Sequence, residues 1–337
     1  MAKITSTPSR NDFIGNPIVY SVQSATAVVG SSFHRVKFRV PVKQNDVLKK
    51  EFILSQSIAG TAAETVNFDI SSCFRAVADT YLSTLSPLAG GTSVTFAKFS
   101  AEPSAFDVYV LDNAEITTTE DRAAKITSHI GSYTDYERRK SSVNTTLSRK
   151  PGQTENVCPG DIIVYPLLDE ENNSTQSVAY AVPETVSLGT TLNMPNGHSY
   201  YVVQKPQGSR LFQFVNSRGC IESIRAFGMN ITKLNGESSS SVISRFERFN
   251  QFSRTIVRKH IKPTEIQMSS GPVTHEWAQW WAYEFCQATH IWMLDDNGVW
   301  LPCNVTIGEN PTILDQTKTA LLSVNFTVTP DLNGPLW

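Results

Sequence analysis

Alternation of apolar and charged side chains is the feature that most constrains how this chain can fold. Within Phe33–Val42, apolar residues occupy every second position from Val36 onward, and basic residues alternate with them as far as Arg39. The apolar positions are Val36, Phe38, Val40 and Val42, and the basic ones are Arg35, Lys37 and Arg39. A period of two places each set on its own face of a β-strand, whereas a helix would mix them. The segment is therefore predicted to be a strand with one face in the core.

Similar runs recur in both halves of the chain, and helical spacing is confined to two short segments. Further strands are predicted at 16–27, 52–58, 94–99, 106–110, 161–168, 176–182, 199–204, 210–215, 291–294, 299–301 and 321–328. A short helix is predicted after Asp69 or Ser71 as N-cap, and another over Glu276–Ala288 with Thr274 as its cap. The predicted fold class is mainly β, with β-sandwich-like domains and a few short α-helices.

Length and a change in composition predict two domains. A chain of 337 residues is about two domains long. Residues 113–160 are rich in Thr, Ser, Asn and both signs of charge, and their apolar residues are thinly spread. We expect a β-rich domain with one short helix at 1–112, an extended polar arm or linker at 113–160, and a β-rich domain with a Trp-rich helix and a hairpin at 161–337. Such an arm usually binds something, and a neighbouring subunit is one candidate.

Cysteine usage and hydropathy predict reduced thiols and synthesis in a cytosol. The five cysteines are at 73, 158, 220, 286 and 303, an odd number without a C-x-x-C pair, and they are expected to be mostly buried. No secretory signal follows Met1. The longest apolar run, 162–168, is too short for a bilayer-spanning helix, so no membrane insertion is expected.

Local motifs for catalysis and metal binding are missing or incomplete. The nucleophile elbow, the phosphate-binding loop and the dinucleotide fingerprint do not occur. His275-Glu276 fails the zinc motif H-E-x-x-H because Gln279 stands where the second His is required. Asp295–Gly298 is predicted to be a hairpin turn rather than a calcium loop. We expect no enzymatic activity, metal or cofactor, although a glycosidase carboxylate pair from distant strands would leave no local motif.

All six tryptophans lie between Trp277 and Trp337. Trp277, Trp281 and Phe285 share one helical face with Trp280 beside them, which favours a packed core over a stacking platform for sugars or bases. One or two of the tryptophans would also suit a subunit interface. The candidates for aromatic contact or core are Trp277, Trp280, Trp281, Trp292 and Trp300. The alternative function is a carbohydrate-binding β-sandwich module that uses exposed residues such as Trp280 and Trp300.

The net charge of −2 conceals a basic segment. Between Lys205 and Lys262, eleven Lys or Arg and three Glu give a net charge of +8, which leaves −10 for the rest of the chain. This uneven distribution of charge predicts head-to-tail association between copies of the chain. Nucleic acid is a secondary candidate partner, because Phe246, Phe249 and Phe252 interleave with basic residues. Both strand and helix periods fit this stretch in part. The candidate interface residues are Arg245, Arg248, Arg254, Arg258, Lys259 and Lys262.

Three further segments are distinctive: Asn16-Pro17-Ile18-Val19, Asn67-Phe68-Asp69-Ile70-Ser71 and Phe212-Gln213-Phe214-Val215-Asn216-Ser217-Arg218-Gly219. Together they resemble virion structural proteins of tailed bacteriophages, of the distal-tail or baseplate-adaptor kind. The resemblance implies a mainly β, two-domain subunit without enzymatic activity that assembles into a homo-oligomeric ring and joins neighbouring tail proteins. It also implies that the protein is made in the host cytoplasm and resides in the virion tail, with no small-molecule substrate.

Overall fold

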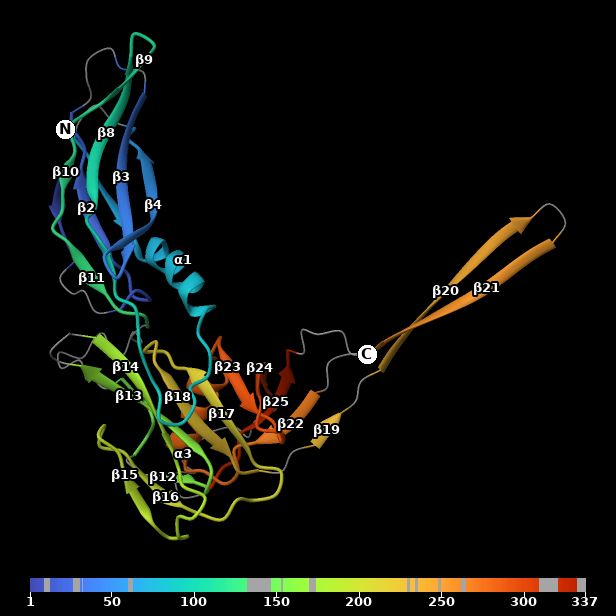
Figure 1. The fold of residues 1–337 in the computed structure, drawn as a ribbon. Coiled ribbons are helices and arrows are strands. Elements are labelled where there is room, and N and C mark those ends of the chain that lie inside the picture. The colour runs from blue at the N-terminus through green and yellow to red at the C-terminus, as the bar shows by residue number, and fades with distance from the viewer. Residues whose placement is uncertain are drawn as a thin grey trace. The chain divides into compact units, whose positions relative to one another are not determined.

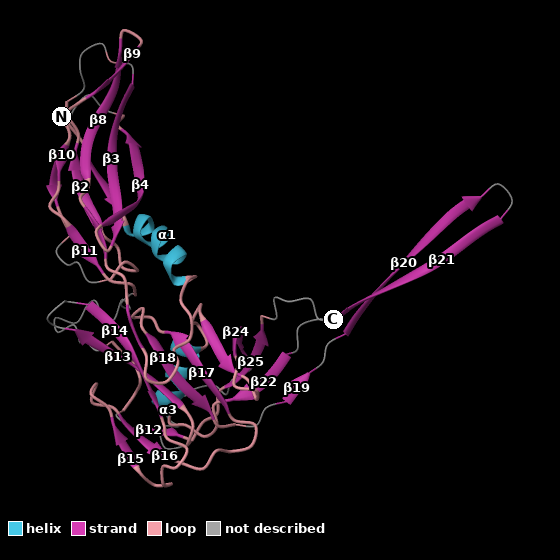
Figure 2. Cartoon of the chain, in the orientation of Figure 1, coloured by secondary structure: helices cyan, strands magenta, loops and turns pink. Residues whose placement is uncertain are grey.

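The computed structural model describes residues 1–8, 13–26, 31, 33–59, 63–131, 147–152, 154–169, 174–228, 231–233, 236–247, 250–261, 265–308 and 321–331. Strands dominate this part of the chain, and helices occur at only two places within it (Figure 2). The predicted mainly β class with few helices is confirmed.

The chain forms two compact units, and each is described separately. The first comprises Met1–Ser148, Tyr165–Ala179 and Asn216–Ile221, and the second comprises Arg149–Val164, Tyr180–Val215 and Glu222–Trp337. The division is therefore not sequential, unlike the 1–112, 113–160 and 161–337 scheme expected from composition.

The described elements follow the order shown in Figure 1. Up to residue 128 they are β1 (Lys3–Ser6), β2 (Val19–Gln23), β3 (Phe33–Gln44), β4 (Val47–Ser57), β5 (Thr65–Asp69), α1 (Ser71–Leu82), β6 (Ser93–Thr95), β7 (Phe99–Ala101), β8 (Ser104–Leu111), β9 (Ala114–Thr117), β10 (Asp121–Arg122) and β11 (Ile126–Ser128). Beyond it they are β12 (Thr154–Val157), β13 (Ile162–Asp169), β14 (Ser174–Ala181), β15 (Thr191–Asn193), β16 (Ser199–Val202), β17 (Arg210–Val215), β18 (Ile221–Ala226), β19 (Ile231–Lys233), β20 (Gly236–Glu247), β21 (Asn250–Ile261), β22 (Glu265–Ser269), α3 (His275–Trp280), the π-helix η1 (Trp281–Phe285), β23 (Ile291–Leu294), β24 (Trp300–Ile307) and β25 (Asn325–Pro330).

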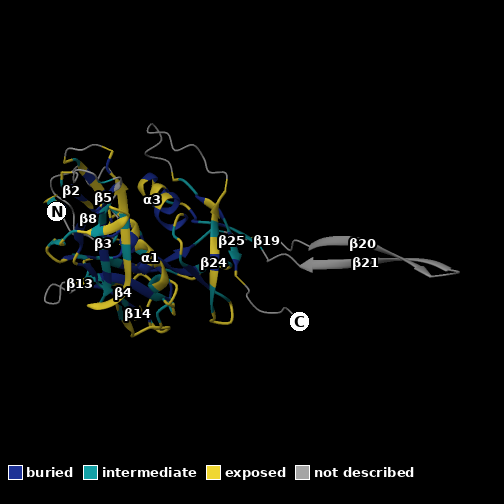
Figure 3. Ribbon diagram, turned by 90° about the horizontal axis from the view of Figure 1, so that it is seen from above, coloured by how far each residue is buried: buried dark blue, intermediate teal, exposed yellow. Residues whose placement is uncertain are grey.

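A seven-stranded sheet built around β3 organises the first unit. Its strand order is β10-β8-β3-β7-β11, with β4 paired to β3 and β9 paired to β8. The alternating apolar residues of β3 are fully buried, as the sequence predicted. Phe38 stacks on Phe68 of the β1-β2-β5 sheet, with ring centroids 5.2 Å apart, and contacts Tyr20 at 5.3 Å. β4 is exposed over most of its length (Figure 3), and β3 is its only strand partner in the described chain.

The start of α1 differs from both predicted caps. The N-cap position is Ile70, which has no side chain able to accept a hydrogen bond. The Asp69 carboxylate instead accepts from the backbone N of Ser71 at 2.9 Å and of Ile18 at 3.0 Å. Asp69 therefore stabilises the helix start and the entry to β2 at once, which joins two of the three segments that carry the phage resemblance.

The third of these segments ends in a tight turn. Asn216 Oδ1 accepts from the backbone N of Arg218 at 3.0 Å and of Cys220 at 2.9 Å. Gly219 has a φ of 77°, and a Cβ atom there would come within 2.6 Å of the Ile130 carbonyl oxygen. Only glycine suits both the left-handed backbone and this close approach.

Part of the predicted polar arm belongs to the large sheet. β9, β10 and β11 lie within residues 113–160 and pair with β8, β8 and β7. Ile126 and Ile130 are buried, at 2% and 6% exposure. Composition misses such strands because a sheet that is half solvated needs an apolar residue at only every second position. Residues 132–146 of the arm lie outside the described residues.

The second unit is centred on a sheet of order β18-β17-β23-β24-β25-β22-β19. The turn predicted at Asp295–Gly298 joins β23 to β24, with Gly298 at a φ of 77° and Asp295 N donating to Val299 O at 2.9 Å. The hairpin prediction is confirmed. No helix in the described part of the chain is long and apolar enough to cross a bilayer.

Truncating a ring at the centre of the first core tests this packing. Replacing Phe38 by Ala removes a fully buried ring that contacts Phe68, so we expect the free energy of unfolding to fall by about 3–5 kcal/mol. Guanidinium-induced unfolding followed by circular dichroism measures this loss of unfolding free energy. Ile53→Ala is the control, since Ile53 is 55% exposed on β4 and should cost about 0.5 kcal/mol or less. Equal losses in the two variants would contradict the assigned core.

The thiols provide a second test. All five cysteines are free and buried, as expected, and burial raises the pKa of Cys286 and Cys303 to about 12. A buried, protonated thiol reacts slowly because the thiolate is the nucleophile. We expect Ellman's reagent to modify almost no thiol in the native protein near pH 8 and all five after unfolding. Rapid modification of the native chain would place a cysteine at the surface instead.

Candidate functional site

The basic stretch near residue 250 is a long antiparallel hairpin. β20 and β21 each contain 12 residues, and their register runs without a shift from Gly236 opposite Ile261 to Glu247 opposite Asn250. The strand period therefore holds here, and the helical one does not. Among the described strands, β20 and β21 pair only with each other.

Four of the six candidate interface residues lie in this hairpin. The Cα partners are Arg245 with Phe252, Arg254 with Ile243, Arg258 with Ser239, and Lys259 with Ser238. Arg248 and Lys262 lie outside the described residues. The fold thus gathers candidates up to 14 positions apart in sequence into one two-stranded element.

Other members of the basic segment are neutralised inside the second unit. Arg225 Nε donates to Asp161 Oδ2 at 2.7 Å, its Nη2 donates to Asp161 Oδ1, and its Nη1 donates to Ser209 Oγ at 2.9 Å. Both side chains of the Arg225–Asp161 pair are 3% exposed. Arg210 makes a bidentate pair with Asp296. The net charge of +8 therefore overstates the positive surface, because part of it is cancelled by acidic residues outside the segment.

The Trp-rich segment begins as predicted and then changes its helical pitch. Thr274 is the N-cap of α3, and its side chain accepts from the backbone N of Trp277 at 3.5 Å. From Trp281 the turns widen into a π-helix, with Cys286 N donating to Trp281 O at 2.9 Å. Such widened turns occur often at functional sites.

The candidate tryptophans occupy different environments. Trp280 and Trp281 are 5% and 1% exposed and belong to an aromatic core with Phe212, Phe214, Phe285 and Phe326. Trp277 is half-buried and packs against that core, with its ring 5.3 Å from Trp280 at 73°. Trp292 is buried and Trp300 is half-buried. Trp280 therefore offers too little exposed ring to stack a sugar, whereas Trp277 and Trp300 remain accessible.

A cavity of about 360 Å³ lies beside Trp277 in the second unit. It is lined by Thr154, Glu155, Asn156, Ile224, Arg225, Phe227, Ser270, Pro272, Val273, Thr274, Trp277, Trp281 and Leu321. β12, β18, the turn before α3 and the helical segment therefore each contribute to its wall.

A second buried ion pair stands beside this cavity. Lys150 Nζ donates to Glu155 Oε2 at 2.5 Å and to the Ser223 carbonyl oxygen at 2.6 Å. The side chains are 3% and 10% exposed. Burial raises the pKa of the Glu155 carboxyl above its ordinary value, and the neighbouring Lys150 charge offsets this only in part.

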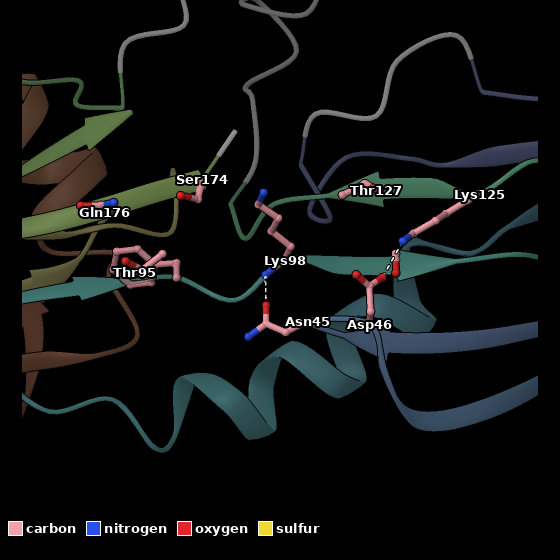
Figure 4. A pocket seen from close by; sticks show the side chains of 10 residues that line it. Asn45, Asp46, Thr95, Lys98, Lys125, Thr127, Ser174 and Gln176 are labelled. Atoms are coloured by element: carbon pink, nitrogen blue, oxygen red, sulfur yellow. Dashed lines mark hydrogen bonds and ion pairs between the residues drawn. The ribbon is translucent and has the colours of Figure 1, made fainter. Parts of the chain in front are cut away.

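A larger polar cavity of about 780 Å³ lies in the first unit (Figure 4). Asn45 and Asp46 form a left-handed turn between β3 and β4, with φ of 48° and 63°. Asn45 Oδ1 accepts from Lys98 N at 3.0 Å, and Asn45 N donates to Lys98 O at 2.9 Å. Asp46 pairs with Lys125 at 2.5 Å, and the Lys125 ammonium lowers the pKa of the Asp46 carboxyl. The lining residues include neither His nor Cys.

The incomplete zinc motif has a structural role. His275 Nε2 lies 3.1 Å from the amide nitrogen of Gln279, the residue that stands in the second His position. Within the described residues, no group of three or more His, Cys, Asp or Glu side chains is arranged to hold a metal ion.

Sequence reasoning missed the buried charges of both units. Asp107 is fully buried in β8, where its carboxylate lies 3.0 Å from His34 Nε2. Glu222 and Arg225 are buried in β18. A single charged residue inside an otherwise apolar strand, as in Phe106-Asp107-Val108, could have indicated a buried ion pair. Such a residue is stable in a core only when it is paired.

No protein-family model matches the chain, and no curated protein sequence matches it.

Removing one partner of the Arg225–Asp161 pair should destabilise the second unit strongly. Asp161→Ala leaves a guanidinium 3% exposed without its carboxylate, so we expect a loss of about 3–5 kcal/mol in the free energy of unfolding. The control is Asp296→Ala, whose carboxylate is 76% exposed and pairs with Arg210, and it should cost about 1 kcal/mol or less. Urea unfolding monitored by tryptophan fluorescence reports on this unit. Similar losses in both variants would show that burial does not decide the strength of the pair.

Proposed function

We propose that this chain is a non-enzymatic structural subunit of a tailed-phage virion that assembles into a ring and joins neighbouring tail proteins. The β20–β21 hairpin is its assembly element. The observation that carries the proposal is that two 12-residue strands pair with no third strand in the described chain.

A lone hairpin of this length needs a partner. An isolated two-stranded ribbon is marginally stable in water, and each of its outer edges presents unpaired backbone groups. The sequence of the two strands also contains seven large apolar residues: Val242, Ile243, Phe246, Phe252, Ile256, Val257 and Ile261. Burial of such residues against a neighbouring subunit would supply the stability that the ribbon lacks.

Charge favours another protein surface as the partner. β21 contains Arg254, Arg258 and Lys259 and no acidic residue. The chain as a whole carries a net charge of −2, so the rest of a second copy is acidic and complements the hairpin. The resemblance of three segments to distal-tail and baseplate-adaptor proteins supports the virion context.

Deleting the hairpin tests its role in assembly. Replacing residues 237–260 by a short Gly/Ser turn should convert a ring into monomers while leaving the sheet of the second unit folded. Light scattering after size exclusion gives the mass, negative-stain microscopy shows the ring, and circular dichroism checks the fold. The expected result is a homo-oligomeric wild type and a monomeric deletion variant. A wild type that is monomeric both in solution and in purified particles would overturn the proposal.

Charge reversal separates the hairpin from general charge effects. Arg254→Glu combined with Arg258→Glu should weaken self-association by about tenfold or more, because like charges would then face each other across the interface. The matched control reverses Lys49 and Lys50 on β4, which are exposed and lie in the other unit. Equal weakening by both pairs would contradict a specific role of the hairpin.

A further inference from the structure

The cavity beside Trp277 has the size and composition of a small-ligand site. Its volume of about 360 Å³ falls in the range of about 300–1,000 Å³ typical of such sites. Its lining combines apolar residues such as Trp281, Ile224 and Phe227 with a few polar ones. It belongs entirely to the second unit and contains no residue of the β20–β21 hairpin.

Trp277 supplies an aromatic surface with a fixed orientation. Its ring packs edge-to-face on Trp280, which is itself held in the core between Phe214 and Trp281. The half-buried state of Trp277 leaves part of the ring toward the cavity that it lines. A rigid, partly exposed indole binds apolar faces at little entropic cost.

Glu155 supplies an unpartnered acceptor. The carboxylate is 10% exposed, and Lys150 engages only Oε2. In the described chain no donor reaches Oε1, so this oxygen is available to accept a hydrogen bond from a ligand. Thr154 and Asn156 precede and follow Glu155 in β12 and also line the cavity; their side chains are exposed on the other face of the strand and have no hydrogen-bond partner among the described residues.

The charges around the cavity cancel. Lys150 neutralises Glu155, and Asp161 neutralises Arg225, whose donors are taken up by Asp161 and Ser209. A strongly anionic or cationic ligand would therefore find no net opposite charge. The free groups are one acceptor oxygen, one hydroxyl, one amide and an aromatic face, and this set matches a neutral ring that carries several hydroxyl groups.

We propose that this cavity binds one residue of a neutral sugar, whose C–H face stacks on Trp277 and whose hydroxyl groups donate to Glu155 Oε1 and, around the edge of β12, bond the Asn156 amide. The site is distinct from the assembly element and gives the subunit a second activity, contact with a glycan. It also differs from a platform on Trp280 and Trp300, because Trp280 is a core residue.

A glycan array probed with the full-length protein tests the proposal. We expect neutral glycans among the ligands, and titration of the best of them should shift tryptophan fluorescence. Trp277→Ala and Asn156→Ala should each weaken binding by about tenfold or more. Trp300→Ala is the matched control, because Trp300 is also half-buried but does not line the cavity. This control should bind like the wild type.

Two further variants distinguish loss of the binding site from loss of the fold and a neutral ligand from a cationic one. Asn156→Ala changes an exposed side chain, so it tests the site even where Trp277→Ala lowers the melting temperature and has to be replaced by Trp277→Phe. Glu155→Gln keeps an acceptor oxygen but removes the charge, so a neutral sugar should still bind while an organic cation such as choline would not. No binding to any neutral glycan, unchanged binding by the Trp277 and Asn156 variants, or a preference for choline would each overturn the proposal.

Discussion

The buried Arg225–Asp161 pair is the interaction on which the architecture of the second unit depends. Asp161 follows β12 in the chain, and Arg225 lies in β18, so the pair fixes two segments that are 64 residues apart. Asp161 also accepts from Cys158 N at 2.9 Å, which closes the turn after β12. Removal of either partner would leave an uncompensated buried charge, which is strongly destabilising, so the pair holds these two segments together.

Local sequence patterns correctly predicted the strands and helices whose buried side chains recur at regular spacing. β3, the β23–β24 turn and the Thr274 cap follow from alternation, from Asn-Gly and from a capping residue before an apolar helix face. The basic stretch stayed ambiguous between strand and helix because its apolar and basic residues fit both periods in part, and the pairing of β20 with β21 that decides between them is not visible in that spacing. β18 was not predicted, since Glu222 and Arg225 interrupt its apolar pattern, and only distant partners make those charges stable.

The same limit applies to the candidate sites. Composition located the tryptophans and the basic segment, but it could not separate Trp280 in the core from Trp277 at its edge, because the π-helix alters the rotation between successive turns. The net charge also could not show that Asp161 neutralises Arg225, whereas the arginines of β21 lie in a two-stranded sheet that pairs with no other described strand. Proximity in space, and not residue type, decides which charges remain available to a partner.

The interleaved division of the chain has a mechanical consequence. The backbone passes between the two units five times, at residues 148, 164, 179, 215 and 221. A pulling force applied to one unit is therefore shared among several covalent connections instead of a single linker. The first unit also cannot finish folding during synthesis until residue 221 has emerged, so neither unit is separable by a simple truncation.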